Sequence, residues 1–98
     1  MNRTRSITWD DPTPGISAAR RMSGIEYLRA IALGEAPAPP FARLLGFEIE
    51  AIEEGKVTFA MTPAEFHYNP FGVMHGGVAA SLFDSALGCA VQSLLPAG

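Results

Sequence analysis

Residues 75–95 read HGGVAASLFDSALGCAVQSLL, and Asp84 is the only charged residue in this stretch. The Ala and Leu content predicts one long helix, from about Gly76 to Leu95, that is buried inside a globular domain. Moving an unpaired carboxylate out of water is costly, so a lone Asp in such a helix is expected to have a specific role. The glycines before the helix leave backbone N–H groups free to meet a ligand oxygen. A carboxylate near such donors provides the groups that acyl transfer requires at the least.

Two short segments before this helix predict a β-hairpin. Residues 47–52 and 56–61 alternate mostly between apolar and polar side chains, and Glu54-Gly55 supplies the turn between them. The loop that follows, residues 63–74, carries Pro, Asn, Gly and aromatics without a period, and we expect it to be ordered. The side chains expected on the inward face of the hairpin are Phe47, Ile49, Ala51, Val57, Phe59 and Met61.

The sequence before the hairpin divides into two parts, a leader at 1–22 and a helical extension at 23–46. The leader holds Pro, Gly and Ser without a period, so we expect it to be flexible, with Arg3 and Arg5 solvated. In the extension, Ser23 begins a capping-box pattern that predicts a helix ending near residue 34. A proline-rich connector follows, and then one further helical turn that Gly46 is expected to end. The third part, residues 47–98, holds the hairpin and the long helix.

The composition is that of a globular chain with a small negative charge. The net charge is −3, and six of the seven basic residues lie before Leu44, so we do not expect a nucleic-acid binder. No long apolar run begins the chain, and polar residues interrupt the later one, which argues against a signal peptide and a membrane span. The single cysteine, Cys89, fits a reducing cytoplasm. Two histidines without clustered carboxylates argue against a metal site, and we expect no cofactor.

The run HYNPFGVMHGGVAASLFD at residues 67–84 resembles the signature of the hotdog-fold thioesterases, specifically their phenylacetate-degradation (PaaI-like) branch. An Asn stands six residues before a His, then comes Gly-Gly, and an Asp stands nine residues after the His. The resemblance covers about residues 41–98 and implies an α+β hotdog fold, in which a curved antiparallel sheet wraps the long helix. Family members continue beyond this helix with strands that complete the sheet, so we expect this chain to be the N-terminal portion of a longer protein.

The resemblance implies a role for each residue of the motif. Asp84 would act as general base or nucleophile on the thioester carbonyl carbon, and the Gly76 N–H would polarise the carbonyl oxygen. Asn69 would position the thioester or the attacking water from across a dimer interface. His75 would border the site and orient the loop, and Gly77 would let the backbone come close to the ligand.

The same resemblance implies the substrate and the assembly. An acyl-CoA would be cleaved to free acid and CoA by a homodimer or a homotetramer. The rings of Tyr68 and Phe71 suit an aryl or medium-chain acyl group. Ser85 is next to Asp84 on one polar stripe of the predicted helix and is a further candidate for substrate binding.

Other interpretations of these residues stay open at this point. Asn69 could be only a turn residue before a proline, His75 a helix cap, and Gly76-Gly77 a tight junction between loop and helix. A hotdog hydratase or dehydratase would pair His75 with Asp84 for proton transfer to carbon, although the spacing fits the thioesterase pattern better. A non-catalytic acyl-CoA binder, or a truncated subunit that acts by association, would need no chemistry at Asp84.

Overall fold

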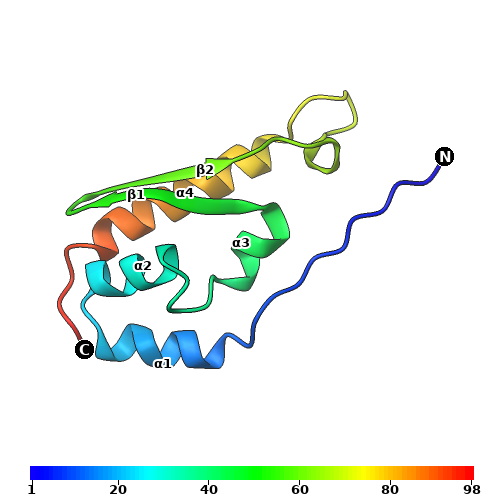
Figure 1. The fold of residues 1–98 in the computed structure, drawn as a ribbon. Helices are drawn as coiled ribbons and strands as arrows, with labels where there is room; N and C mark the ends of the chain where they lie inside the picture. Colours follow the sequence, from blue (N-terminus) through cyan, green and yellow to red (C-terminus); the bar gives the residue numbers. More distant parts are fainter.

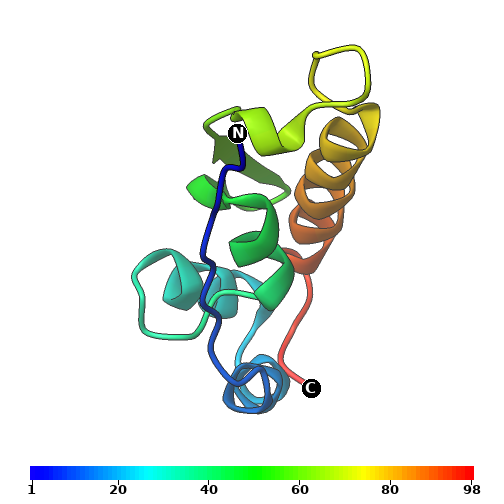
Figure 2. The same cartoon turned by 90° about the vertical axis from the view of Figure 1, so that its right-hand side faces the viewer.

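The computed structural model describes residues 1–98, in which four α-helices lie to one side of one two-stranded antiparallel sheet in an α+β arrangement (Figure 1). Helix α4 packs on β2, and α2 packs on both β1 and α4, so these four elements enclose the core. Helix α1 contacts α2 at the end of the molecule away from the hairpin (Figure 2). The elements are α1 (Thr13–Arg21), α2 (Gly24–Ala32), α3 (Pro40–Leu45), β1 (Phe47–Glu53), β2 (Lys56–Met61), the 3₁₀ turn η1 (Glu65–His67) and α4 (Gly76–Gln92).

The hairpin turn and the helix ends before it form as the sequence predicts. Gly55 in the turn has φ +75°, and Gly46 at the end of α3 has φ +82°, both left-handed conformations that favour glycine. At the start of α2, Ser23 Oγ accepts a hydrogen bond from the Glu26 N–H at 3.4 Å. These features depend on neighbouring residues alone, which is why the local sequence predicts them.

A β-bulge changes the inward face of β1. Ile49 pairs with Phe59 and Ala51 pairs with Thr58, so Glu50 between them has no partner. The extra residue reverses the alternation, and Ala51 is exposed whereas Ile52 is half-buried. The predicted inward position of Ala51 is therefore wrong.

A regular helix, α1, occupies residues 13–21 of the segment that the sequence predicts to be a flexible leader. Pro14 stands in its first turn, where the missing N–H is not needed, and Asp11 Oδ1 accepts a hydrogen bond from the Thr13 N–H at 2.9 Å. This hydrogen bond holds the pKa of the Asp11 carboxyl below its usual value. The predicted flexibility of the leader is therefore wrong for these residues. The sequence does not indicate this helix, because Pro and Gly in its first turn leave little apolar periodicity.

The core of the chain is small. Eleven of the 98 residues are buried, so much of the apolar side-chain surface remains exposed. The radius of gyration is 14.7 Å, whereas a compact domain of this length has about 12.6 Å. The molecule is correspondingly elongated, with extents of 48 × 26 × 18 Å.

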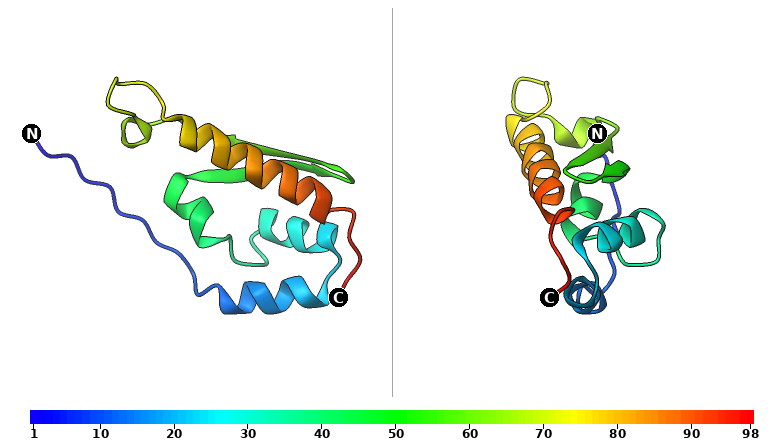
Figure 3. Two further views of the ribbon diagram at one scale, coloured as in Figure 1. Left: turned by 180° about the vertical axis from the view of Figure 1, so that it is seen from behind. Right: turned by 90° about the vertical axis from the view of Figure 1, so that its left-hand side faces the viewer.

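Helix α4 is exposed along its outer side, which no other element covers (Figure 3). Phe83 and Leu87 are each 68% exposed, Val91 is 61% exposed, and Val78 is the only buried residue of the helix. The predicted burial of this helix is therefore wrong for the chain by itself. None of the helices combines the length and the apolar character that crossing a membrane would require.

Ser93 joins the end of α4 to the hairpin turn. Its buried Oγ accepts a hydrogen bond from the Gly55 N–H at 2.8 Å and donates one to the Ala90 carbonyl oxygen at 2.6 Å. Ser93→Ala leaves the Gly55 N–H without a partner, and we expect the free energy of unfolding to fall by about 1–3 kcal/mol, measured by urea denaturation. Ser85→Ala is the matched control, because the Ser85 hydroxyl makes no hydrogen bond within the chain, and an equal loss in both variants would contradict this role.

Candidate functional site

The first turn of α4 is organised by His75, which is the N-cap of the helix. His75 Nδ1 accepts a hydrogen bond from the Gly77 N–H at 2.8 Å, and the His75 N–H donates to the His67 carbonyl oxygen at 2.8 Å. A Cβ on Gly77 would lie 2.9 Å from His75 Nδ1, so the cap itself requires glycine at this position. His75 and Gly77 thus have a local structural role, one of the alternatives that the sequence leaves open.

Gly76 is the first residue of α4, and its N–H has no acceptor within the chain. The residue is exposed, and a Cβ built on it would meet no atom within 4 Å. The unpartnered N–H therefore belongs to an exposed residue at the positive end of a helix of 17 residues. A carbonyl oxygen that gains negative charge could accept a hydrogen bond at this position.

Asn69 closes the loop that precedes α4. Its Oδ1 accepts hydrogen bonds from the Phe71 N–H at 2.9 Å and the Val73 N–H at 3.3 Å, while its own N–H donates to the Val73 carbonyl oxygen at 2.7 Å. Gly72 supplies the left-handed residue of this turn, with φ +79°. The side-chain oxygen of Asn69 is therefore committed to the loop, and Nδ2 is the part of the side chain that remains for a ligand.

The two predicted aromatic contacts of the substrate lie on the same loop and are exposed. Phe71 is 89% exposed and Tyr68 is 54% exposed, and Tyr68 pairs with Met74 across the base of the loop. Neither ring lines the groove beside Asp84. Within one chain, the structure does not bring Tyr68 and Phe71 together with Asp84 and Ser85.

Asp84 and Ser85 line a groove of about 740 Å³ between α4, α2, α3 and the sheet. Asp84 is exposed and lies on the border between this groove and the uncovered side of α4. Asp84 stands eight positions after Gly76, which is about 12 Å along a helix. One carbonyl group cannot contact both residues of the same chain.

His67 has a structural role, since it is 4% exposed and both ring nitrogens are hydrogen-bonded. Its Nδ1 accepts from the Ala64 N–H at 3.0 Å, so Nε2 carries the hydrogen and donates to the Leu45 carbonyl oxygen at 2.8 Å. The ring thereby joins η1 to the end of α3. It leaves no nitrogen for a substrate or a metal ion.

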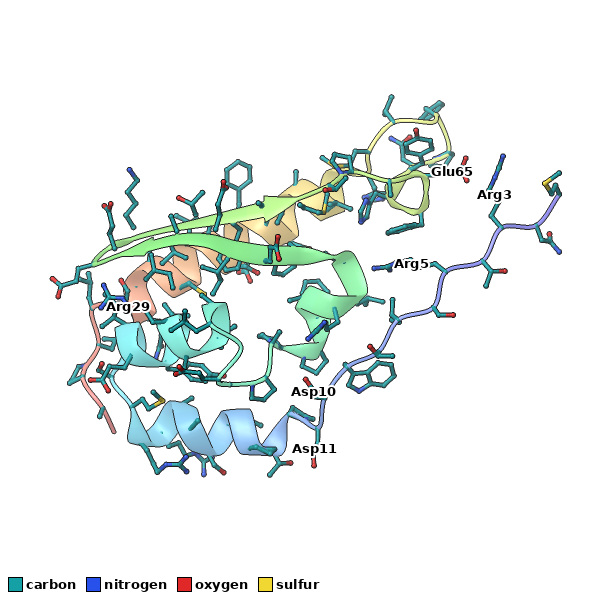
Figure 4. All side chains as sticks on the ribbon, in the orientation of Figure 1. Arg3, Arg5, Asp10, Asp11, Arg29 and Glu65 are labelled. Carbon is teal, nitrogen blue, oxygen red and sulfur yellow. The ribbon has the colours of Figure 1, made fainter.

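Arg5 anchors the N-terminal segment to η1 and α3 (Figure 4). Its guanidinium carbon lies 4.1 Å from the centroid of the Phe66 ring, and its N–H groups donate to the carbonyl oxygens of Leu44 at 2.7 Å and Arg43 at 3.2 Å. The expectation that Arg5 is merely solvated is wrong. No local signal predicts these contacts, because 38 and 39 residues separate Arg5 from the two carbonyls.

Cys89 is half-buried in the wall of the groove that holds Asp84. Burial raises the pKa of its thiol above the usual value. The pKa of the Tyr27 hydroxyl is raised as well, first by its own burial and then by the neighbouring Cys89. The sequence gives no indication of this groove or of the place of Cys89 in its wall.

No three His, Cys, Asp or Glu side chains lie together in a way that could hold a metal ion. Comparison with family models, with curated proteins and with solved structures finds no match for this chain. What the chain does therefore has to be inferred from its own residues and their placement.

Proposed function

We propose that this chain is a hotdog-type thioesterase that hydrolyses acyl-CoA, and that each active site is completed by a second copy. The observation that carries the proposal is the pairing, on one helix, of an unpartnered Gly76 N–H with the lone carboxylate of Asp84 two turns later. The motif of residues 67–84 supports the same assignment. Because the two groups lie about 12 Å apart along one chain, a site that uses both needs two chains.

The outer face of α4 suits such a pairing of copies. We define this face by its exposed residues Gly76, Ala80, Phe83, Asp84, Leu87 and Val91. Ala80 lies midway between Gly76 and Asp84, both along the helix and around it. A twofold axis near Ala80 would set two α4 helices antiparallel, with Asp84 of one copy level with the partner's Gly76. The same contact would cover Phe83 and Leu87, which are largely exposed in one chain.

The reaction at this composite site follows from the two groups. The thioester carbonyl oxygen would accept a hydrogen bond from the Gly76 N–H, where negative charge develops on it. The Asp84 carboxylate would take a proton from water as the water oxygen bonds to the carbonyl carbon, and the C–S bond then breaks. The proton passes to the CoA thiolate, which leaves as free thiol. Direct attack by Asp84, followed by hydrolysis of the mixed anhydride, gives the same products.

A hydratase or dehydratase of the same fold is less well supported. Such an enzyme would need a free nitrogen of His75 to remove or deliver a proton at carbon. His75 Nδ1 is engaged by the Gly77 N–H, which leaves Nε2 carrying the hydrogen in the neutral ring. The ring could act as a base only by giving up the helix cap.

The test is release of CoA thiol from aryl- and medium-chain acyl-CoAs, with Gly76→Pro compared with Gly76→Ala. Proline is tolerated as the first residue of a helix, and His75 has the extended conformation, φ −61° and ψ 133°, that a following proline requires. Gly76→Pro therefore removes only the N–H, and we expect kcat to fall by about a hundredfold. Gly76→Ala keeps the N–H and its methyl group meets no atom of its own chain, so kcat should fall far less than in Gly76→Pro.

Two outcomes would count against the proposal. Equal activity in Gly76→Pro and Gly76→Ala would show that the N–H does not contact the reacting carbonyl. No thiol release by the parent chain with any substrate would leave a non-catalytic acyl-CoA binder as the better description. Circular dichroism of both variants establishes that each helix still forms.

A further inference from the structure

The groove beside Asp84 is a cavity of ligand size whose walls come mostly from the N-terminal half of the chain. Leu28 and Ile31 of α2 form one wall, Phe41 of α3 and Phe47 of β1 form another, and α4 contributes the third. Its volume of about 740 Å³ falls within the range of small-molecule sites, about 300–1,000 Å³. Most of its lining is apolar, as in sites that bind a hydrophobic group.

We propose that this groove binds the acyl chain of the substrate and that it selects a medium-chain aliphatic group. This inference rests on the thioesterase proposed above. It assigns the acyl-binding role to α2, α3 and the start of β1, whereas the sequence places that role on the aromatic loop at Tyr68 and Phe71.

The lining of the groove suits a flexible hydrocarbon chain. Three phenyl rings follow one another along it: Phe41 and Phe47 have centroids 6.1 Å apart, and Phe47 and Phe59 have centroids 5.5 Å apart. Both pairs are edge-to-face, with interplanar angles of 71° and 83°, so the rings hold one another in place. A preformed apolar wall of this kind gains affinity with each CH₂ group that it covers.

The groove also reaches the proposed catalytic carboxylate, and its charged lining residues are Arg43, Glu48 and Asp84. Asp84 and Ser85 belong to the α4 wall, and the Ser85 hydroxyl makes no hydrogen bond within the chain. A chain whose methyl end lies among the phenyl rings could therefore place its carbonyl group beside Asp84. This continuity between an apolar pocket and the lone carboxylate of α4 favours an acyl group over other apolar occupants.

Gly88 keeps the α4 wall open. It lines the groove one turn after Asp84, and a Cβ built on it would meet no atom within 4 Å. A leucine at this lining position would start from an unobstructed Cβ, and leucine is a good helix former. Gly88→Leu is thus a variant that fills the proposed pocket while keeping the helix.

The experiment measures how fast Cys89, the only cysteine, reacts with a disulfide reagent in the presence of S-alkyl-CoA thioethers. These thioethers cannot be hydrolysed and carry no free thiol. We expect decyl-CoA to slow the reaction of Cys89 at least tenfold, because the chain would cover the groove wall. Affinity should rise about fourfold for each CH₂ between hexyl and decyl, and CoA without a chain should not protect. Gly88→Leu should lose the protection, and Thr58→Leu, at an exposed position outside the groove, should keep it.

Protection that does not depend on chain length, or that survives in Gly88→Leu, would overturn the assignment of the groove. Protection that grows with protein concentration in the absence of any thioether would assign the groove to a second copy instead and would overturn it as well. Thiol release from acyl-CoA without protection of Cys89 would overturn the assignment of the groove but would support the thioesterase activity. Protection of Cys89 without thiol release would support an acyl-binding groove and would overturn the thioesterase activity.

Discussion

Asp84→Asn is expected to lower kcat for acyl-CoA hydrolysis by about 10²–10⁴, with little change in KM. The amide has nearly the same shape as the carboxylate, but it can neither take a proton from water nor attack the carbonyl carbon. Thiol release under saturating substrate measures the effect. Hydrolysis at the parent rate in Asp84→Asn would remove the carboxylate from the mechanism, whichever of its two chemical roles is considered.

Mixing two inactive variants tests whether the site is shared between copies. Asp84→Asn and Gly76→Pro each disable every site in their own homodimers. If Asp84 of one copy works with the partner's Gly76, a mixed dimer has one site with both lesions and one intact site. Unfolding and refolding the two variants together should then restore about a quarter of the parent activity, since about half of the dimers are mixed. If both groups came from one chain, mixing would restore nothing.

Gly24→Ala is expected to cause the largest loss of stability. The first residue of α2 packs directly against the end of α4, where the Gly24 N–H donates to the Leu95 carbonyl oxygen at 3.0 Å. A Cβ on Gly24 would overlap the carbonyl group of Gln92, and a backbone carbonyl cannot rotate away as a side chain can. Helix α2 would have to separate from α4, and we expect a loss of about 3 kcal/mol or more.

Thermal unfolding measures this loss, which corresponds to a decrease in Tm of at least about 12 °C for a chain of this size. Gly88→Ala is the matched control, because it also adds one methyl group to a helical glycine but meets open space. We expect Gly88→Ala to raise the free energy of unfolding by up to about 1 kcal/mol. A Tm for Gly24→Ala equal to that of the parent would show that α2 does not dock on α4 in solution.

The features that the sequence predicts correctly are those that neighbouring residues determine. The hairpin turn at Gly55, the end of α3 at Gly46 and the cap of α2 at Ser23 each depend on a few adjacent positions. The bulge at Glu50 escapes prediction because alternation gives no sign of an extra residue until the two strands are paired. Helix α1 is not predicted because Pro and Gly interrupt the apolar pattern of its first turn.

The sequence predicts candidate residues for the site but not the surroundings of those residues. The motif identifies Gly76 and Asp84, yet the groove beside Asp84 is made by helices that lie more than 40 residues earlier in the chain. The burial predicted for α4 presumes a sheet that wraps it, whereas two strands and α2 cover only one side. The hydrogen bonds of the structure show that Asn69 closes a turn and that His75 caps a helix, which the spacing alone could not show.

The contacts of Arg5 determine how far the chain can be shortened from its N-terminus. A protein trimmed to begin at Thr13 would keep every helix and strand of the fold. It would nevertheless lose the Arg5 guanidinium, which lies above the Phe66 ring and donates hydrogen bonds to two carbonyl oxygens in the last turn of α3. A purification tag removed by a protease is therefore better placed ahead of Arg3 than at the start of α1, so that the extended segment stays with the protein.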